Sequence, residues 1–252
     1  MAKSINRPIL PILRKRELVI PGKHGVYDFG DNTFEKRIIE VDIKYIGTSF
    51  NELRTRARSI ASWLSGFNGS QRLIFDDESD KYYSAKIYSE IGLNNLFKIG
   101  EGKLIFECDP FAYALETTGY YYTWSANLTW TSSYTWGQEY TFIVTANVTA
   151  TITNNATFTA RPSFIIIGSF GDFSITQGTA TLTYTEAVSG SQTVTIDSEN
   201  YTVVLGATNK LSVISGSAST DFFEFTTGSN TVIFSGISAN CTVTIDFAPR
   251  YL

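Results

Sequence analysis

Few side chains in this 252-residue chain have the chemistry and spacing of a catalytic site. Its only histidine, His24, lies close to Gly22 and Gly25, a pattern that predicts a loop and not a positioned general base. A histidine triad and a multi-histidine metal site are therefore excluded, and no glycine-rich phosphate loop follows a predicted strand. A glycosidase needs only two carboxylates, but the acidic residues of the second half are few and scattered. We expect no enzyme, no cofactor and no bound metal, with a weak hydrolase as the least favoured alternative.

One acidic cluster, Asp76-Asp77-Glu78-Ser79-Asp80, could bind calcium, because hard cations prefer several carboxylate oxygens. The cluster lacks the spacing of an EF-hand loop and the central glycine of that loop. It lies between Arg72–Phe75 and Tyr82–Tyr88, two segments whose composition predicts strands. We therefore favour a polar hairpin turn over a calcium site.

The two cysteines, Cys108 and Cys241, have no paired spacing that would indicate a zinc site or a redox motif. Free cysteines without such a partner usually behave as small apolar residues. We predict that both thiols are buried, and the sequence leaves any further role of these residues open.

One helix is predicted in the first half of the chain. Ser49-Phe50-Asn51-Glu52 matches a capping box, in which the serine oxygen and the glutamate side chain satisfy the first free amides of a helix. Apolar residues then recur at helical spacing on one face, and Gly66 supplies a stop, so the helix should run from 50 to about 64. The apolar positions are Leu53, Ala57, Ile60, Ala61 and Leu64.

Three arginines of this helix, Arg54, Arg56 and Arg58, lie away from the apolar face. They form either a solvated face or a contact with acidic residues of a neighbouring subunit. Both interpretations are kept. We name these three arginines, together with Asp76 and Asp77, as candidate subunit-interface residues.

Alternating patterns make strands the main predicted element. Arg37–Ile46 alternates apolar with polar residues, which predicts a strand with one buried face, and residues 140–152 continue the same pattern over a longer run. Further strands separated by Gly-, Ser- and Asn-bearing turns are typical of a sandwich or a closed barrel. These candidates are Phe164–Ile167, Ala180–Tyr184, Gln192–Ile196, Tyr201–Leu205, Asp221–Phe225, Thr231–Ser235 and Cys241–Phe247. We expect a mainly β protein, with an α+β first domain that holds one helix, followed by an all-β sandwich.

Charge divides the chain near residue 110. Residues 1–110 hold 17 Lys and Arg against 15 Asp and Glu, whereas residues 111–252 hold 3 against 9. Neither half is basic enough for a nucleic-acid footprint, so sequence-specific nucleic-acid binding is not expected.

No stretch approaches the roughly 20 apolar residues of a membrane helix, and the start has no apolar run of signal-peptide length. Membrane insertion and secretion by that route are not expected.

Composition changes at the same place as charge. An aromatic stretch from Tyr120 to Trp136 leads into a region rich in Thr, Ser and Gly. We place the interdomain linker at about 111–137, which gives a first domain with its linker over 1–137 and a second domain over 138–252. The tryptophans of the linker would also fit a stand-alone carbohydrate-binding module that recognises a host cell-surface polysaccharide, but packing between the domains is the favoured use. These tryptophans are Trp124, Trp130 and Trp136.

The segment 100–113, which contains Glu107-Cys108-Asp109-Pro110-Phe111, resembles the motif that closes the first domain of siphophage distal tail proteins. The order of elements before it is similar to that family, in the short two-domain form found in phages of Gram-positive hosts. Ala156 is a departure, because the family more often has glycine at that position. The other matching segments are Lys36–Val41, Trp63-Leu64, Leu73–Asp77, Asn154–Pro162, Ile196–Glu199 and Phe247–Tyr251.

This resemblance implies a structural virion protein, made in the host cytoplasm and located at the distal end of the phage tail. Members of the family form a homo-hexameric ring through their first domains, which joins the tail tube protein to the tail-associated adsorption or lysin protein of the baseplate. The ring leaves a central channel for DNA, and the near-balanced charge of residues 1–110 suits a wall that must not hold phosphates. The second domains point outward, resemble galectin-like or carbohydrate-binding-module sandwiches, and in some members bind host surface polysaccharide. The expected role is tail assembly and host attachment.

Overall fold

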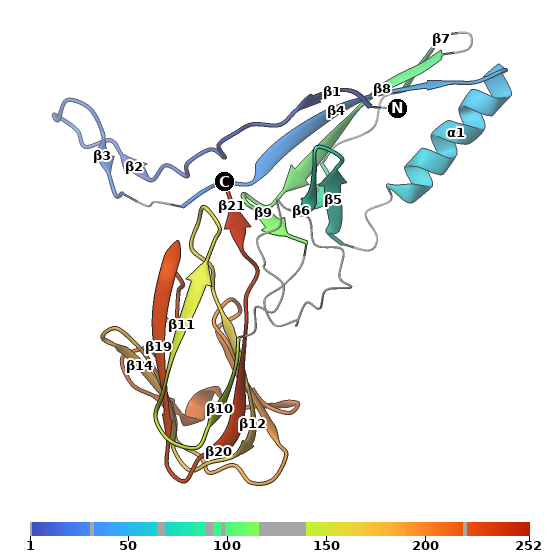
Figure 1. The fold of residues 1–252 in the computed structure, drawn as a ribbon. Coiled ribbons are helices and arrows are strands. Elements are labelled where there is room, and N and C mark those ends of the chain that lie inside the picture. The colour runs from blue at the N-terminus through green and yellow to red at the C-terminus, as the bar shows by residue number, and fades with distance from the viewer. Residues whose placement is uncertain are drawn as a thin grey trace. The chain divides into compact units, whose positions relative to one another are not determined.

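The computed structural model describes residues 2–30, 33–64, 69–88, 93–96, 99–115, 140–218 and 221–252. Contacts divide the chain into two compact units, Met1–Ala112 with Leu252, and Tyr113–Tyr251. Most of the predicted linker at 111–137, including its three tryptophans, lies outside the described residues. Both units are built mainly from antiparallel strands (Figure 1), so the mainly β fold class is confirmed.

The first unit is built on a sheet whose central ladder joins β4 (Arg37–Ile46) to β8 (Ile99–Cys108). The two strands pair along their whole length, from Arg37 opposite Cys108 to Ile46 opposite Ile99. Buried Ile39 and Val41 lie opposite buried Phe106 and Leu104, as the alternating pattern of 37–46 predicts. Four further strands of the first unit belong to this sheet: β1 (Ala2–Asn6) beside β4, β6 (Glu78–Ile87) and β7 (Leu93–Leu96) beside β8, and β5 (Gln71–Phe75) beside β6.

Between β1 and β4 the chain forms an extension that the sequence analysis did not predict. Its strands β2 (Glu17–Leu18) and β3 (Tyr27–Asp28) pair as a hairpin, which Figure 1 shows projecting beyond the end of β4. Backbone hydrogen bonds between Arg14 N and Thr33 O (2.8 Å) and between Phe29 N and Arg16 O (3.0 Å) join its two sides. We call residues 9–29 the arm.

Helix α1 (Phe50–Trp63) begins at the predicted residue. The Ser49 Oγ accepts from the Glu52 backbone N–H at 3.3 Å, while the Glu52 carboxylate accepts from the Thr48 amide at 2.7 Å and the Thr48 hydroxyl at 2.6 Å. Leu53 packs against Gly47, where an added Cβ would lie 2.8 Å from the leucine side chain. The predicted stop at Gly66 lies outside the described residues.

The apolar face of α1 is only partly covered by its own chain. Leu53 is fully buried, whereas Ala57, Ile60 and Leu64 are intermediate and Ala61 is exposed. Phe50 and Trp63, one at each end, are 51% and 76% exposed. In a single copy of the chain such a helix has low stability, because packing of the apolar face supplies most helix stability.

The hairpin between β5 and β6 has a shorter turn than predicted. Only Asp76 and Asp77 form the turn, and β6 already begins at Glu78. Arg7 pairs with both Asp77 and Glu78 at 2.8 Å, and Asp80 pairs with Lys81 at 3.0 Å. Glu78 and Asp80 therefore lie on β6, although the sequence pattern predicted that they belong to the turn.

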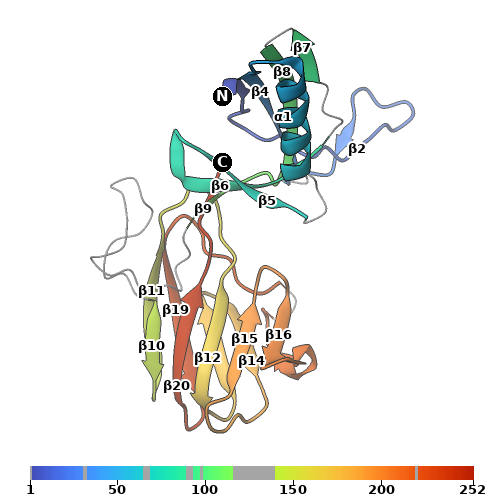
Figure 2. The ribbon, with the colours of Figure 1, turned by 90° about the vertical axis from the view of Figure 1, so that its right-hand side faces the viewer.

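The second unit is a sandwich of two antiparallel sheets (Figure 2). One sheet has the order β10 (Thr141–Val144), β20 (Asn240–Asp246), β12 (Ser163–Ser169), β15 (Thr193–Asp197), β16 (Thr202–Leu205) and β17 (Thr208–Asn209). The other has the order β11 (Val148–Asn154), β19 (Gly228–Gly236), β13 (Phe173–Gln177), β14 (Ala180–Tyr184) and β18 (Ile214–Ser215). A 3-10 turn covers Leu211–Val213, and β9 (Ala112–Ala114) pairs with β21 (Arg250–Tyr251).

Inward residues of both sheets share one aromatic core. Phe164 on β12 is fully buried, and its ring lies 6.2 Å from Phe234 on β19, centroid to centroid. The rings of Phe223 and Phe225, carried by a loop, lie at 5.5 and 6.3 Å from Phe164. All three contacts have the edge-to-face geometry that aromatic pairs favour. The sandwich is therefore closed by a loop as well as by its strands.

Two strand predictions for this unit were wrong. The alternating run 140–152 is two strands in different sheets, because the chain bends at residues 145–147 and crosses from β10 to β11. Asp221–Phe225 alternates like a strand, yet it makes only an isolated bridge from Phe225 to Ala160. Phe222 has φ +57°, a left-handed conformation that a continuous strand does not accommodate.

Replacing Gly168 with alanine should strongly destabilise the protein. Gly168 has φ +139°, and an added Cβ would lie 2.4 Å from Asn240 O and 2.6 Å from Cys241 Cα on the paired strand β20. We expect a loss of about 3 kcal/mol or more in unfolding free energy, measured by denaturant titration. Gly178→Ala is the control: φ is +60° there but nothing lies within 4 Å, so about 1 kcal/mol is expected. Equal losses in both variants would contradict this account.

Candidate functional site

The arm presents an unusual number of apolar side chains to solvent. Ile9, Ile12 and Val19 are 92%, 69% and 72% exposed. Exposed apolar groups scattered singly need no explanation, but a concentration of them within one short segment marks an interaction site. The other exposed apolar residues of the arm are Leu10, Leu13, Leu18, Ile20, Val26, Tyr27 and Phe29.

A buried arginine holds the base of the arm. Arg37, at the start of β4, is 3% exposed, and its NH1 group donates to Pro8 O at 3.1 Å and to the Tyr83 hydroxyl at 3.4 Å. Its guanidinium also lies over the Tyr83 ring, 5.3 Å from the centroid. Arg37 therefore fixes the chain where it leaves β1. Sequence reasoning placed this residue on a strand but gave no sign that it would be buried.

The structure does not bring the five candidate interface residues together as a cluster. Arg54, Arg56 and Arg58 are all exposed on α1. Arg56 pairs with Glu52 at 2.7 Å, one helical turn away, and Arg54 lies over the Phe50 ring at 5.6 Å. Asp77 pairs with Arg7, as described above, and keeps 65% of its side chain exposed.

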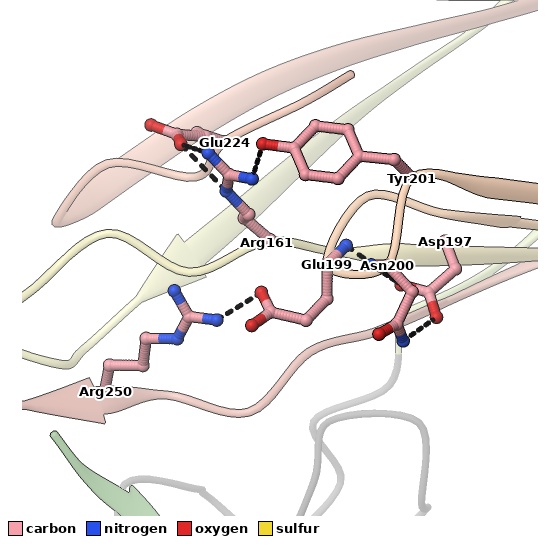
Figure 3. Close-up of polar contacts among 7 residues, drawn as sticks. All are labelled: Arg161, Asp197, Glu199, Asn200, Tyr201, Glu224 and Arg250. Atoms are coloured by element: carbon pink, nitrogen blue, oxygen red, sulfur yellow. Dashed lines mark hydrogen bonds and ion pairs between the residues drawn. The ribbon is translucent and has the colours of Figure 1, made fainter. Parts of the chain in front are cut away.

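In the second unit, charged side chains gather where several loops meet (Figure 3). Arg161 donates to one oxygen of Glu224 from Nε at 2.9 Å and from NH2 at 2.6 Å, and it also donates to the Tyr201 hydroxyl. Its guanidinium lies over the Tyr201 ring, 4.9 Å from the centroid. Beside this group Arg250 pairs with Glu199. The sequence analysis included Arg161 only within the segment Asn154–Pro162 that resembles the distal tail family. It did not predict that Tyr201 and Glu224 are its partners.

The third cation of residues 113–252 is paired as well. Lys210 lies 2.7 Å from Glu186, which in turn accepts from the Tyr184 hydroxyl at 3.2 Å. The hydrogen bond from Lys210 lowers the pKa of Glu186, and burial raises the pKa of Tyr184 to about 12. Every Lys and Arg in this part of the sequence therefore has a glutamate partner.

A hollow of about 640 Å³ opens beside Arg161. It is lined from four segments, which contribute Arg161, Gln177, Tyr201, Asp221, Phe222 and Glu224 among others. Tyr201 and Phe222 both adopt left-handed backbone conformations, with φ +54° and +57°, and their rings meet edge to face at 5.6 Å. Non-glycine residues in this conformation are uncommon and often mark functional positions.

Both cysteines are buried and free, as predicted. Burial raises the pKa of Cys108 to about 12 and that of Cys241 to about 11. Thiolate is the reactive form of cysteine, and a raised pKa keeps both thiols protonated, so neither residue suits a nucleophile.

Within the described ranges, no three His, Cys, Asp or Glu side chains are grouped as a metal site would require. The only α-helix among those residues, α1, is too short and too polar to cross a membrane.

Two family models match the chain. Residues 2–108 match the phage tail protein RIFT-related domain, and residues 149–251 match the C-terminal domain of the siphovirus-type tail component. Together with the two-unit β fold, these matches define a component of a phage tail. The chain belongs to the siphophage distal tail proteins, as its sequence motifs predict. It is accordingly a virion protein.

A solved structure has a similar fold over the whole chain. It is the crystal structure of the SPP1 Dit protein, described as a paradigm of the hub adsorption apparatus in phages that infect Gram-positive hosts. The TM-score is 0.73 at 15% sequence identity, and the match covers 100% of this chain and 93% of that one. At 15% identity, this structural similarity shows that the two chains share a fold. No curated protein matches the chain.

Thiol labelling tests the burial of the cysteines. With pKa values of about 12 and 11, Cys108 and Cys241 should not react with a disulfide reagent in native buffer, and both should react once guanidinium unfolds the chain. Absorbance of the released thiol gives the number of reactive groups. Rapid labelling of either residue in the folded protein would show that its environment is more open than described.

The start of α1 should be sensitive to acid. Hydrogen bonds from the Thr48 side chain and backbone, and from Arg56, lower the pKa of Glu52 to about 2 from an ordinary 4.5. The stability that Glu52 contributes is therefore present above pH 4.5 and is lost as pH falls toward 2. An NMR titration of the Glu52 carboxyl should give a midpoint near 2, and Glu52→Gln should remove this pH dependence. A midpoint near 4.5 would mean that the cap does not form.

Proposed function

We propose that this protein is the structural hub of the phage tail tip and acts by geometry without catalysis. Six copies form a closed ring through the first domain, residues 1–137 with their linker at about 111–137. The ring joins the tail tube protein to the tail-associated adsorption or lysin protein and leaves a channel for DNA. The second domain, residues 138–252, faces outward as a sandwich.

The observation that carries this proposal is the exposed apolar surface of the first unit. An arm with Ile9 at 92% and Val19 at 72% exposed is costly for an isolated chain in water, because apolar surface is stabilised by removal from water. Contact with a second copy would cover it. A patch on one copy that meets a different patch on the next gives a closed ring when the rotation between copies adds up to a full turn, and an open filament when it does not.

The half-covered helix supplies a second surface for the same purpose. Ala57, Ile60 and Leu64 keep part of their apolar surface open, and Trp63 is 76% exposed. A neighbour that covers this face would stabilise α1 beyond what Leu53 alone can do. Arg58 and the exposed part of Asp77 remain candidates for ion pairs across such an interface. Exposed pairs of this kind contribute roughly 0–1 kcal/mol each, so they would set register more than affinity.

A ring through which DNA passes must also have a lumen that does not bind DNA strongly. A strongly basic lumen would hold each phosphate and release it only with counterion exchange, which would slow DNA passage. Residues 1–110 hold 17 Lys and Arg against 15 Asp and Glu, and many of these charges pair within the chain, as Lys36 does with Glu107 at 2.7 Å and Lys103 with Glu40 at 2.9 Å. The near balance supports a channel role.

Val19→Asp should abolish assembly without unfolding the chain. Val19 is 72% exposed, so the substitution costs the monomer little, whereas a charge buried against a neighbour would be strongly unfavourable. Light scattering coupled to size exclusion should give the mass of a hexamer for the parent and of a monomer for the variant.

The matched control is Ile143→Asp, because Ile143 is also 72% exposed but lies in the second unit. This control should remain hexameric, with the same melting temperature as the parent. A monomeric parent at micromolar concentration would overturn the ring, and a hexameric Val19→Asp variant would remove the arm from its interface.

A further inference from the structure

We propose that the open edge of strand β11 pairs with the same edge of a second copy, so that two second units share one continuous antiparallel sheet. The contact lies wholly within the second unit. It uses neither the arm nor α1, so it goes beyond the hub role and does not depend on the ring.

The edges of the sandwich differ in how they are protected. On one side the two sheets end in β17 and β18, which have two residues each. On the other side they end in β10 and β11, and β11 pairs with β19 over all its 7 residues without a register shift. Folded proteins protect edge strands by shortness, bulges, proline or charge. β11 has none of these protections, and residues 140–154 contain no charged residue, proline or glycine.

Hydrogen bonds of Tyr140 show which backbone groups of β11 face the open edge. The Tyr140 hydroxyl accepts from Thr153 N at 3.2 Å and donates to Thr153 O at 3.1 Å. The backbone groups of Thr153 therefore point away from β19, and because this orientation alternates along a strand, those of Thr149 and Thr151 do so too. At Thr149 and Thr151 no described residue hydrogen-bonds to these outward groups, and both side chains are exposed.

These open groups fix the register of the pairing. Two antiparallel copies of β11 centred on Ala150 place Thr149 opposite Thr151 of the second copy, where opposed residues exchange both N–H···O bonds. Centring the pair on Thr151 would instead oppose Thr149 to Thr153, whose groups Tyr140 already occupies. Centring on Ala150 also brings the smallest side chain of the strand to the twofold axis, where crowding between the copies is greatest.

The charge distribution permits this contact between identical copies. Residues 111–252 hold 3 Lys and Arg against 9 Asp and Glu, so two second units repel each other at long range. The strands at the open edge, β10, β11 and β19, carry no charged residue, so their pairing removes no charge from water. Salt screens the repulsion and should therefore strengthen the association. A strand from a basic partner protein would show the opposite dependence on salt.

Sedimentation velocity of the full chain tests the pairing. The paired edge buries much less surface than a standard stable interface, so micromolar samples stay unpaired and association begins toward millimolar concentration. In the Val19→Asp variant, designed to remove the ring contact, the expected change is from monomer to dimer. Adding Thr151→Pro to it should weaken the association about tenfold or more, because proline removes an outward N–H that an edge strand does not need for its own sheet.

The matched control is Thr151→Val, because valine keeps the N–H and the branched shape of threonine. It should associate as its parent does, and circular dichroism should show that both variants are folded. Hydrogen exchange gives a second measurement that needs no substitution in β11. The amides of Thr149 and Thr151 should exchange quickly in dilute samples and more slowly in concentrated ones.

Three results would overturn the proposal: a chain that stays unpaired at millimolar concentration, an association that salt weakens, or a Thr151→Pro variant that pairs as strongly as Thr151→Val. Failure of the hub role is scored separately, by a parent chain that is monomeric at micromolar concentration. The comparison of Thr151→Pro with Thr151→Val holds whether the starting species is a ring or a monomer.

Discussion

The packing of Phe164 is the contact on which the second unit depends. Its ring meets Phe234 of the facing sheet and both Phe223 and Phe225 of the loop 221–225, all edge to face. In this loop Phe223 and Phe225 are buried, Glu224 between them is exposed, and Phe222 has a left-handed backbone conformation. The core therefore dictates where the carboxylate beside Arg161 lies. Disturbing the interior of the sandwich would move the polar surface above it.

The first unit follows a different principle, since its own chain leaves much of its apolar surface uncovered. The β4–β8 ladder is regular and buries Ile39 and Leu104, yet the arm and α1 contribute little to that core. A chain designed only for its own stability would bury such side chains or replace them with polar ones. Belonging to the distal tail proteins gives the exposed surface a reason, because a tail component functions only in contact with other chains.

Local rules predicted the elements that depend on local sequence. The alternation of 37–46 and the capping box at Ser49 gave β4 and the start of α1, because period and cap chemistry involve neighbours in the chain. The same reasoning could not separate β10 from β11, since alternation continues across a bend that moves the chain between sheets. It also missed the hollow, whose lining comes from segments up to 63 residues apart, as Arg161 and Glu224 are. Only tertiary packing brings those side chains together.

The pairing of every lysine and arginine in residues 113–252 with a glutamate has an electrostatic consequence at longer range. With three cations neutralised by Glu186, Glu199 and Glu224, the remaining acidic residues, including Asp172 and Asp221, leave a field of one sign around this part of the protein. Such a field repels phosphate-bearing polymers of a cell envelope and fades within a Debye length of about 8 Å at physiological salt. Approach to an anionic envelope would then become easier as ionic strength rises, the reverse of an encounter driven by opposite charges.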